Sequence, residues 1–205
     1  MTGERFSMKK IAIYSGSFNP LHIGHLAIIK HMLEKADFDM VYLIVSPKNP
    51  LKDSISSASA RDRYNAAVSA INRHFLEVED CVDDMPKSSR VKVDDIELTM
   101  PEPHYTIRTL DALLQREPNN AFTFVMGADS LADIRRWKDY TRILKEYGVA
   151  VFPRKGYDLT QIKQDLLAEN PDYKIQIINA PLVTVSSTQI REAMQRGDDT
   201  SHLLM

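Results

Sequence analysis

The chain has 205 residues, of which 43% are apolar and 26% charged, with a formal net charge of -2. This composition is typical of a globular protein with a sizeable core, and it excludes a mainly disordered chain. A net charge so close to zero argues against a general nucleic-acid binder, which is usually strongly basic. The single cysteine, Cys81, excludes a disulfide framework and a multi-cysteine zinc site.

The chain shows no sign of a membrane segment or of several domains. Residues 1–8 form a polar lead without the apolar core of a signal peptide. Residues 9–205 are expected to form a single domain, because no repeat, low-complexity tract or linker interrupts them. No apolar run approaches the ~18 residues needed to span a bilayer, so we expect a cytoplasmic protein.

Strand-like and helix-like segments alternate along the whole chain. Short apolar runs predict strands at 11–14, 40–45, 75–78, 91–98, 121–126, 148–152 and 175–178. Helical spacing of apolar residues predicts helices from Gly24 and at 60–75, 107–114, 130–147, 159–167 and 186–196. This order predicts a doubly wound α/β sheet, mainly parallel, with helices on both faces. In such sheets ligands bind beyond the carboxyl ends of the strands, so the turns there are the places to look for chemistry.

The turn after the first strand has the character of a phosphate site. Residues 16–25 read Gly-Ser-Phe-Asn-Pro-Leu-His-Ile-Gly-His. Glycine and small polar residues near a helix N-terminus leave backbone N–H groups free for an anion. His22 and His25 lie on one side of a helical first turn, where both can donate to phosphate oxygens, and Gly24 allows close backbone approach. The alternative is a pair of solvated or core histidines.

Two common classes of nucleotide site are disfavoured by this turn. It matches neither the dinucleotide fingerprint Gly-x-Gly-x-x-Gly nor the P-loop, which argues against a dehydrogenase and a P-loop NTPase. A metal site is not expected either, because no third ligand with suitable spacing accompanies the two histidines.

The start of the last helix has a similar character. Ser186, Ser187 and Thr188 are helix-capping residue types whose hydroxyls and amides can face an anion. One turn later, Arg191 adds a planar fork of donors suited to phosphate. The alternative is a plain helix cap with a solvated arginine. Together with the first turn, this segment predicts a site in which two helix N-termini face one polyphosphate.

These two segments carry a resemblance to a known superfamily. Gly-Ser-Phe-Asn-Pro-x-His-x-Gly-His followed by Ser-Ser-Thr-x-x-Arg resembles the nucleotidylyltransferases with the HxGH signature. Further segments fall in the order seen in bacterial nicotinate-nucleotide adenylyltransferases, namely 47–52, 103–106, 126–130, Trp137 and 153–157. The resemblance implies a Rossmann-like fold and an enzyme of NAD biosynthesis. It would transfer the adenylyl group of ATP, carried with Mg²⁺, to nicotinate mononucleotide, giving deamido-NAD and pyrophosphate.

The resemblance also implies roles for individual residues. The catalytic positions are His22, His25 and Arg191, which bind the ATP phosphates and stabilise the transition state. The remaining ATP-binding positions are Gly16, Ser17, Phe18, Gly24, Asp129, Ser187 and Thr188. The acceptor-side positions are Lys52, Thr106 and Trp137, the last two around the pyridine ring. The alternatives are helix caps at Thr106 and Asp129, a core position for Trp137 and a solvated loop charge at Lys52. Leu51 stands where the family usually has a histidine.

The expected chemistry needs no nucleophilic side chain. A phosphate oxygen of the mononucleotide is already anionic at neutral pH, so it can attack the α-phosphate in line without a general base or a covalent intermediate. The other acceptors considered are nicotinamide mononucleotide and phosphopantetheine. Phosphopantetheine enzymes are usually shorter, with threonine at the position of His22. Outside this enzyme class, the alternatives are a non-catalytic nucleotide sensor and an interaction protein without a ligand. The expected partners are the two substrates, with no nucleic acid or membrane, and the sequence leaves the oligomeric state open.

Overall fold

The fold is taken from a computed structural model, which describes residues 8–47, 59–76, 81–82, 85–86, 90–180 and 185–205. Within these residues, no helix is both long and apolar enough to cross a membrane.

Parallel strands form one six-stranded sheet in the order β5-β2-β1-β6-β7-β8. The sheet starts at β1, grows to one side through β2 and β5, and continues on the other side with β6, β7 and β8. The switch in strand order therefore lies at β1, which pairs with both β2 and β6. This order is that of the Rossmann-like fold, and it confirms the predicted doubly wound α/β sheet. The strands are β1 Lys10–Gly16, β2 Met40–Val45, β5 Val91–Asp94, β6 Ala121–Gly127, β7 Val149–Phe152 and β8 Ile175–Ile177.

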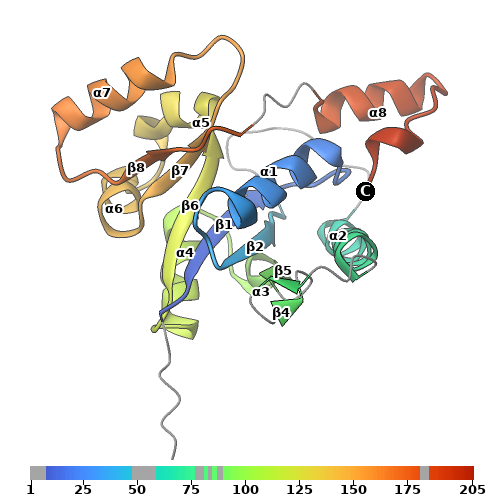
Figure 1. Cartoon of the computed structure of the whole chain (residues 1–205), viewed down its shortest axis with the longest axis horizontal. Helices are drawn as coiled ribbons and strands as arrows, with labels where there is room; N and C mark the ends of the chain where they lie inside the picture. Colours follow the sequence, from blue (N-terminus) through green and yellow to red (C-terminus); the bar gives the residue numbers. More distant parts are fainter. Residues whose placement is uncertain (1–7, 48–58, 77–80, 83–84, 87–89, 181–184) are drawn as a thin grey trace, which may run out of the picture.

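Helices cover both faces of the sheet because successive strand residues point to opposite sides (Figure 1). In β1, Ala12 and Tyr14 pack into a core with helices α1 and α2, whereas Ile11 and Ile13 pack into a second core with α4 and α7. Helix α8 lies beside α1, away from α7 (Figure 1). The long helices are α1 Ile23–Glu34, α2 Ala60–Leu76, α4 Thr106–Arg116, α7 Leu159–Glu169 and α8 Ser187–Gln195.

The shorter elements are β3 Cys81–Val82 and β4 Met85–Pro86, which pair antiparallel, α3 Ile96–Thr99, α5 Ala128–Ala132, α6 Tyr140–Arg142 and three short turns of 3₁₀ or π type. The short turns are η2 Ile134–Arg136, η3 Ile143–Tyr147 and η4 Ser201–Leu203.

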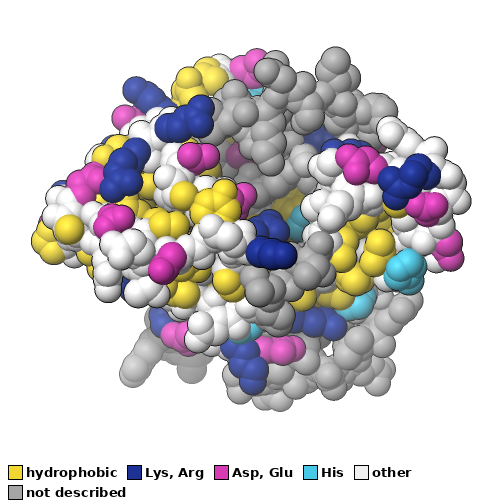
Figure 2. All heavy atoms as spheres, turned by 90° about the horizontal axis from the view of Figure 1, so that it is seen from above, with side chains coloured by type: hydrophobic (Ala, Val, Ile, Leu, Met, Phe, Trp, Pro, Cys, Tyr) yellow, Lys and Arg dark blue, Asp and Glu magenta, His cyan; other side chains and the backbone are white. Residues whose placement is uncertain are grey.

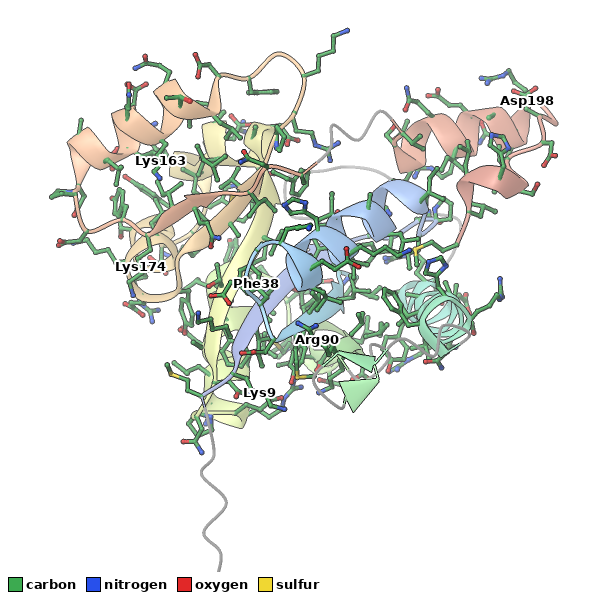
Figure 3. All side chains as sticks on the ribbon, viewed as in Figure 1. Lys9, Phe38, Arg90, Lys163, Lys174 and Asp198 are labelled. Atoms are coloured by element: carbon green, nitrogen blue, oxygen red, sulfur yellow. The ribbon has the colours of Figure 1, made fainter. Side chains whose placement is uncertain are left out.

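Arg90 closes the end of α1 next to the amino end of the sheet. Its guanidinium donates to the carbonyl oxygens of Leu33 at 3.2 Å, Phe38 at 2.7 Å and Asp39 at 2.8 Å. Figure 3 shows Arg90 and Phe38 near one another below α1. The last carbonyls of a helix have no partner within the helix, so these bonds satisfy groups that would otherwise need water. Arg90 is thus a structural clamp on the side of the sheet opposite to the strand carboxyl ends.

Three predicted elements differ from the structure. The strand predicted at 75–78 is wrong at its start, because Phe75 belongs to α2, while 77–78 lie outside the described residues. The strand predicted at 91–98 ends at Asp94, whose carboxylate accepts from the Ile96 amide at 3.0 Å and turns the chain into α3. The helix predicted at 130–147 is broken, because Trp137 is extended and Asp139 has a φ of 51°.

Candidate active site

The turn after β1 is shaped by Phe18. This residue has a φ of 44°, in the left-handed region, and its ring is buried at 3% exposure. A Cβ placed on Gly16 would lie 3.2 Å from the Phe18 ring, a tight contact that glycine avoids. The ring in turn meets Tyr14 edge-on at a centroid distance of 5.6 Å. The turn therefore folds back on the end of β1 and leaves Ser17 exposed at its outer side.

His22 and His25 cap α1, because the Nδ1 atom of each ring accepts from a backbone amide in the first turn. The Nδ1 atom of His22 accepts from the Gly24 amide at 3.1 Å, and Nδ1 of His25 accepts from the His22 amide at 3.2 Å. The two rings lie 3.7 Å apart between centroids, so the predicted pairing on one side is present. Because both Nδ1 atoms accept, the neutral rings carry their proton on Nε2, the atom able to donate to an anion.

Both histidines are neutral at pH 7 in the free protein. Burial lowers the pKa of His22 to about 4, and the cation of Arg154 adds to the effect. Burial also lowers the pKa of His25 to about 3, with further contributions from His22 and Arg154. The pair therefore offers N–H donors to a phosphate rather than fixed positive charges.

The lowered pKa values predict a pH-dependent stability. Between pH 6.5 and about 4 the unfolded chain binds protons at these histidines and the folded chain does not. The contribution of the two neutral histidines to the free energy of unfolding should therefore be complete above pH 6.5 and should decrease as the pH drops toward 4. Urea unfolding across pH 4–7 measures this slope. His25→Asn should flatten it, and an equal slope in His25→Asn and the parent protein would contradict the assignment.

Helix α8 packs its N-terminus against the turn after β1. The Ser187 hydroxyl donates to the Pro20 carbonyl at 3.2 Å across 167 residues of sequence. Arg191 donates from Nη1 to the Asn19 carbonyl at 2.7 Å and from Nη2 to the Thr188 hydroxyl at 3.1 Å. Ser186 caps the helix, with its Oγ accepting from the Gln189 amide at 3.3 Å. The two helix N-termini that the sequence assigned to one polyphosphate thus lie side by side.

Asp129 and Arg154 follow the carboxyl ends of β6 and β7. Asp129 is exposed, and its Oδ1 lies 3.7 Å from Nε of Arg154, whose guanidinium sits 5.0 Å from the centre of the Phe152 ring. The cap of α5 is Gly127, so Asp129 is not the helix cap that sequence left as an alternative. Sequence reasoning gave Arg154 no role, although its position directly after the strand at 148–152 was the available signal.

Gly127 leaves no room for a side chain beside Asp129. A Cβ at this position would lie 2.3 Å from Oδ1 of Asp129, so Gly127→Ala must move that carboxylate. If Asp129 contacts ATP, the KM for ATP should rise by about tenfold, the scale of one lost charged hydrogen bond. Steady-state kinetics with Asp129→Ala and the double variant provide the control. The double variant should be no worse than Asp129→Ala alone, and additive losses would show that Gly127 acts elsewhere.

Two of the residues that the resemblance places on the acceptor side, Thr106 and Trp137, lie in the described part of the chain. Thr106 is the first residue of α4, whose cap is Tyr105, so Thr106 is not the cap. Trp137 is partly buried and meets Phe124 edge-on, with 5.8 Å between ring centroids. These contacts belong to the face of the sheet opposite to Tyr14 and Phe18, and they do not join the two residues to the histidines. Lys52 and Leu51 lie outside the described residues.

The carboxyl ends of the strands face upward in Figure 1. Seen from above, this face has a hollow near its middle, with Lys or Arg and His side chains beside it (Figure 2). Among the described residues, no group of three or more His, Cys, Asp or Glu side chains is placed to hold a metal ion. The donors gathered here are N–H and O–H groups, which suit an anionic ligand.

Comparison with known proteins agrees with this geometry. Residues 13–193 match the model of the cytidylyltransferase-like family. Because this match spans most of its residues, the chain belongs to the cytidylyltransferase-like family. Within it, the chain groups with the nicotinate-nucleotide adenylyltransferases. It is 35% identical to a probable nicotinate-nucleotide adenylyltransferase of Flavobacterium johnsoniae, over 95% of this chain and 91% of the relative. The corresponding protein of Flavobacterium psychrophilum is 37% identical with the same coverage.

Solved structures support the fold. The nicotinic acid mononucleotide adenylyltransferase of Plasmodium falciparum, in complex with NaAD, has a TM-score of 0.72 to this chain. The match covers 94% of this chain and 87% of that one at 22% identity.

Proposed function

We propose that this chain transfers the adenylyl group of MgATP to nicotinate mononucleotide, releasing pyrophosphate and deamido-NAD. The observation that carries the proposal is the contact between the start of α8 and the turn after β1, made by Ser187 and Arg191. This contact brings the N-terminus of α8 and Arg191 close to the turn that carries the histidine pair and leads into α1. The relatives named nicotinate-nucleotide adenylyltransferase, which match nearly the whole chain, support the choice of substrates.

On this proposal the phosphates of ATP bind between the two helix starts. His22 and His25 donate from Nε2, Thr188 donates its hydroxyl, and Ser187 and Thr188 donate backbone N–H groups, while the Ser187 hydroxyl stays bonded to the Pro20 carbonyl. Arg191 has five N–H donors, so its contacts to Asn19 and Thr188 leave donors for the β- and γ-phosphates. Gly16, Ser17, Phe18 and Gly24 line the nucleotide side, and Asp129 lies near the ribose. Mg²⁺ enters as part of the substrate MgATP and neutralises phosphate charge.

The reaction then needs positioning more than side-chain chemistry. A phosphate oxygen of nicotinate mononucleotide attacks the α-phosphorus of ATP and forms a new P–O bond. The bond to the bridging oxygen of the β-phosphate breaks, and its electron pair leaves with pyrophosphate. Negative charge moves toward the leaving group, where the neutral histidine donors and Arg191 stabilise it. Histidines that are neutral at pH 7 fit this step, because the reaction needs N–H groups that donate hydrogen bonds and no proton has to be transferred.

The acceptor is proposed to lie toward Thr106, Trp137 and Lys52. Trp137 is the sole tryptophan of the chain, so its fluorescence reports directly on this side. An aromatic face suits a flat heterocycle. Titration with nicotinate mononucleotide should change the emission, and Trp137→Phe should keep more affinity than Trp137→Ala. Unchanged affinity in Trp137→Ala would leave this tryptophan as a core residue packed on Phe124.

A panel of acceptors tests the proposed function. The protein is incubated with MgATP and, separately, nicotinate mononucleotide, nicotinamide mononucleotide and phosphopantetheine, and pyrophosphate is measured. We expect the highest kcat/KM with nicotinate mononucleotide. Release of pyrophosphate with phosphopantetheine alone, or with none of the acceptors, would refute the proposal.

A further inference from the structure

Arg63 is a buried cation that the mechanism does not use. It lies on α2, is 4% exposed, and reaches the carboxyl ends of two strands. Its Nη1 donates to the carbonyl oxygens of Ser17 at 2.6 Å and Ser46 at 2.9 Å, and its Nη2 donates to that of Pro47 at 3.0 Å. Burying a guanidinium is costly unless its donors are bonded. The three bonds offset part of that cost, since Nε has no hydrogen-bond partner among the described residues, and they fix all three carbonyls to one rigid, planar group.

The three carbonyls belong to segments that leave neighbouring strands. Gly16 at the end of β1 is in register with Val45 at the end of β2, and the Ser46 amide donates to the Gly16 carbonyl at 2.9 Å. Ser17 opens the turn that carries the two histidines, while Ser46 and Pro47 open the segment after β2. Arg63 therefore sets the spacing between these two segments where they diverge.

A second buried ionisable residue, Glu97, lies near the segment after β2, on the side of the sheet that carries α3 and α4. The carboxylate of Glu97 on α3, also 4% exposed, accepts from the Thr109 hydroxyl at 2.8 Å. Burial raises the pKa of Glu97, and the nearby Thr109 and Ser46 side chains oppose this shift. Thr109 lies one turn after Thr106 on α4. A continuous line of polar contacts thus runs from the turn after β1, through Ser46, to the helix that begins on the acceptor side.

We propose that Arg63 is a positioning residue for adenylyl transfer. It holds the turn that receives the ATP phosphates in a fixed relation to the end of β2 and, through Ser46 and Glu97, to helix α4. This inference rests on the proposed function, because these are its ATP and acceptor sides. In-line attack requires the reacting atoms at about 3–3.5 Å in good alignment, and a misplacement of about 1 Å can cost about 100-fold in rate.

The test compares Arg63→Lys and Arg63→Met with Arg90→Met. Arg90 also donates to three carbonyls, but next to the amino end of the sheet. Arg90→Met therefore removes the same number of arginine–carbonyl hydrogen bonds as Arg63→Met, at a position away from the proposed site. Lysine keeps the charge of Arg63 but cannot bind three carbonyls with a rigid, planar group. Arg63→Lys also allows the measurement to be made if Arg63→Met does not fold. Kinetics are measured at a temperature where circular dichroism shows all compared variants folded.

We expect Arg63→Lys to lower kcat by about tenfold or more and to weaken binding of a non-hydrolysable ATP analogue, while Arg90→Met stays within about twofold of the parent protein in both. The inference is overturned if Arg63→Lys has parental kcat and analogue affinity, or if both positions lose activity only in proportion to the unfolded fraction. Analogue binding by calorimetry does not involve the acceptor. Its result therefore separates a failure of Arg63 from a parent protein that makes no deamido-NAD.

Discussion

Replacing His25 by alanine should lower kcat by about 10²–10³-fold, the usual cost of deleting one donor to a developing charge. His25 offers Nε2–H toward the proposed phosphate site, while its Nδ1 accepts from the His22 amide. Alanine removes both contacts, so the variant should also unfold at a lower temperature, by the amount expected for a lost helix cap. The fold should persist, although alanine also removes the contacts of the His25 ring with Tyr14 and Phe18, whose ring centroids lie 6.0 and 5.2 Å away. Turnover and thermal unfolding measured on the same preparation check both effects.

Two further substitutions separate the donor from the cap. In His25→Asn the side-chain oxygen can take the place of Nδ1, which restores the cap without a donor at the position of Nε2. In His25→Gln the amide can reach the position of Nε2 and donate there. We expect His25→Asn to be stable but as slow as the alanine variant, and His25→Gln to recover part of kcat. Near-normal turnover in His25→Asn would remove His25 from the reaction.

Replacing Arg191 by alanine should raise the KM for ATP by about 10- to 100-fold, the range for losing a hydrogen bond between charged groups. Arg191 is the point at which α8 meets the turn after β1, through its bond to the Asn19 carbonyl. Its loss removes a proposed phosphate ligand and loosens the contact between α8 and the turn after β1. Binding of a non-hydrolysable ATP analogue, measured by calorimetry, reports the loss without the acceptor.

Arg191→Lys should rescue this binding only in part, since a point charge does not replace a planar fork that holds Asn19 and Thr188 at once. Arg196→Ala is the matched control on the same helix, because Arg196 pairs with Asp198 at the far end of α8. Its affinity for the analogue should equal that of the parent protein. Full rescue by lysine would show that only charge matters at position 191.

Much of the fold follows from local sequence because its strands are short apolar runs closed by glycine, proline or polar residues. The segments at 40–45 and 121–126 are fully recognisable in this way, and they form β2 and β6. The break in the helix predicted at 130–147 could not be recognised in this way, because it depends on the local backbone conformation of two residues. A left-handed Asp139 and an extended Trp137 break the helix, and apolar spacing carries no signal for either.

The site likewise contains residues that the sequence could predict and contacts that only the folded chain brings about. The histidine pair and the start of α8 were recognisable because phosphate-binding groups cluster within a few residues of each other. Their mutual contact, made by Arg191 and Asn19, spans 172 residues and depends on the folded sheet. The roles of Arg154 and Arg63 depend on packing between elements, since each acts through neighbours that are remote in sequence. A lone arginine on a helix is usually solvated, so sequence alone gave no reason to select Arg63, whereas the only signal for Arg154 was its place directly after a predicted strand.

Transfer of label from ATP tests most directly whether the protein moves an adenylyl group. The protein is incubated with nicotinate mononucleotide and MgATP labelled with ³²P either at the α- or at the γ-phosphate, and the products are separated. We expect the α-label to appear in deamido-NAD, the γ-label to appear in pyrophosphate, and neither to remain on the protein. Label from the γ-phosphate in orthophosphate or on the mononucleotide, or α-label bound covalently to the protein, would contradict this expectation.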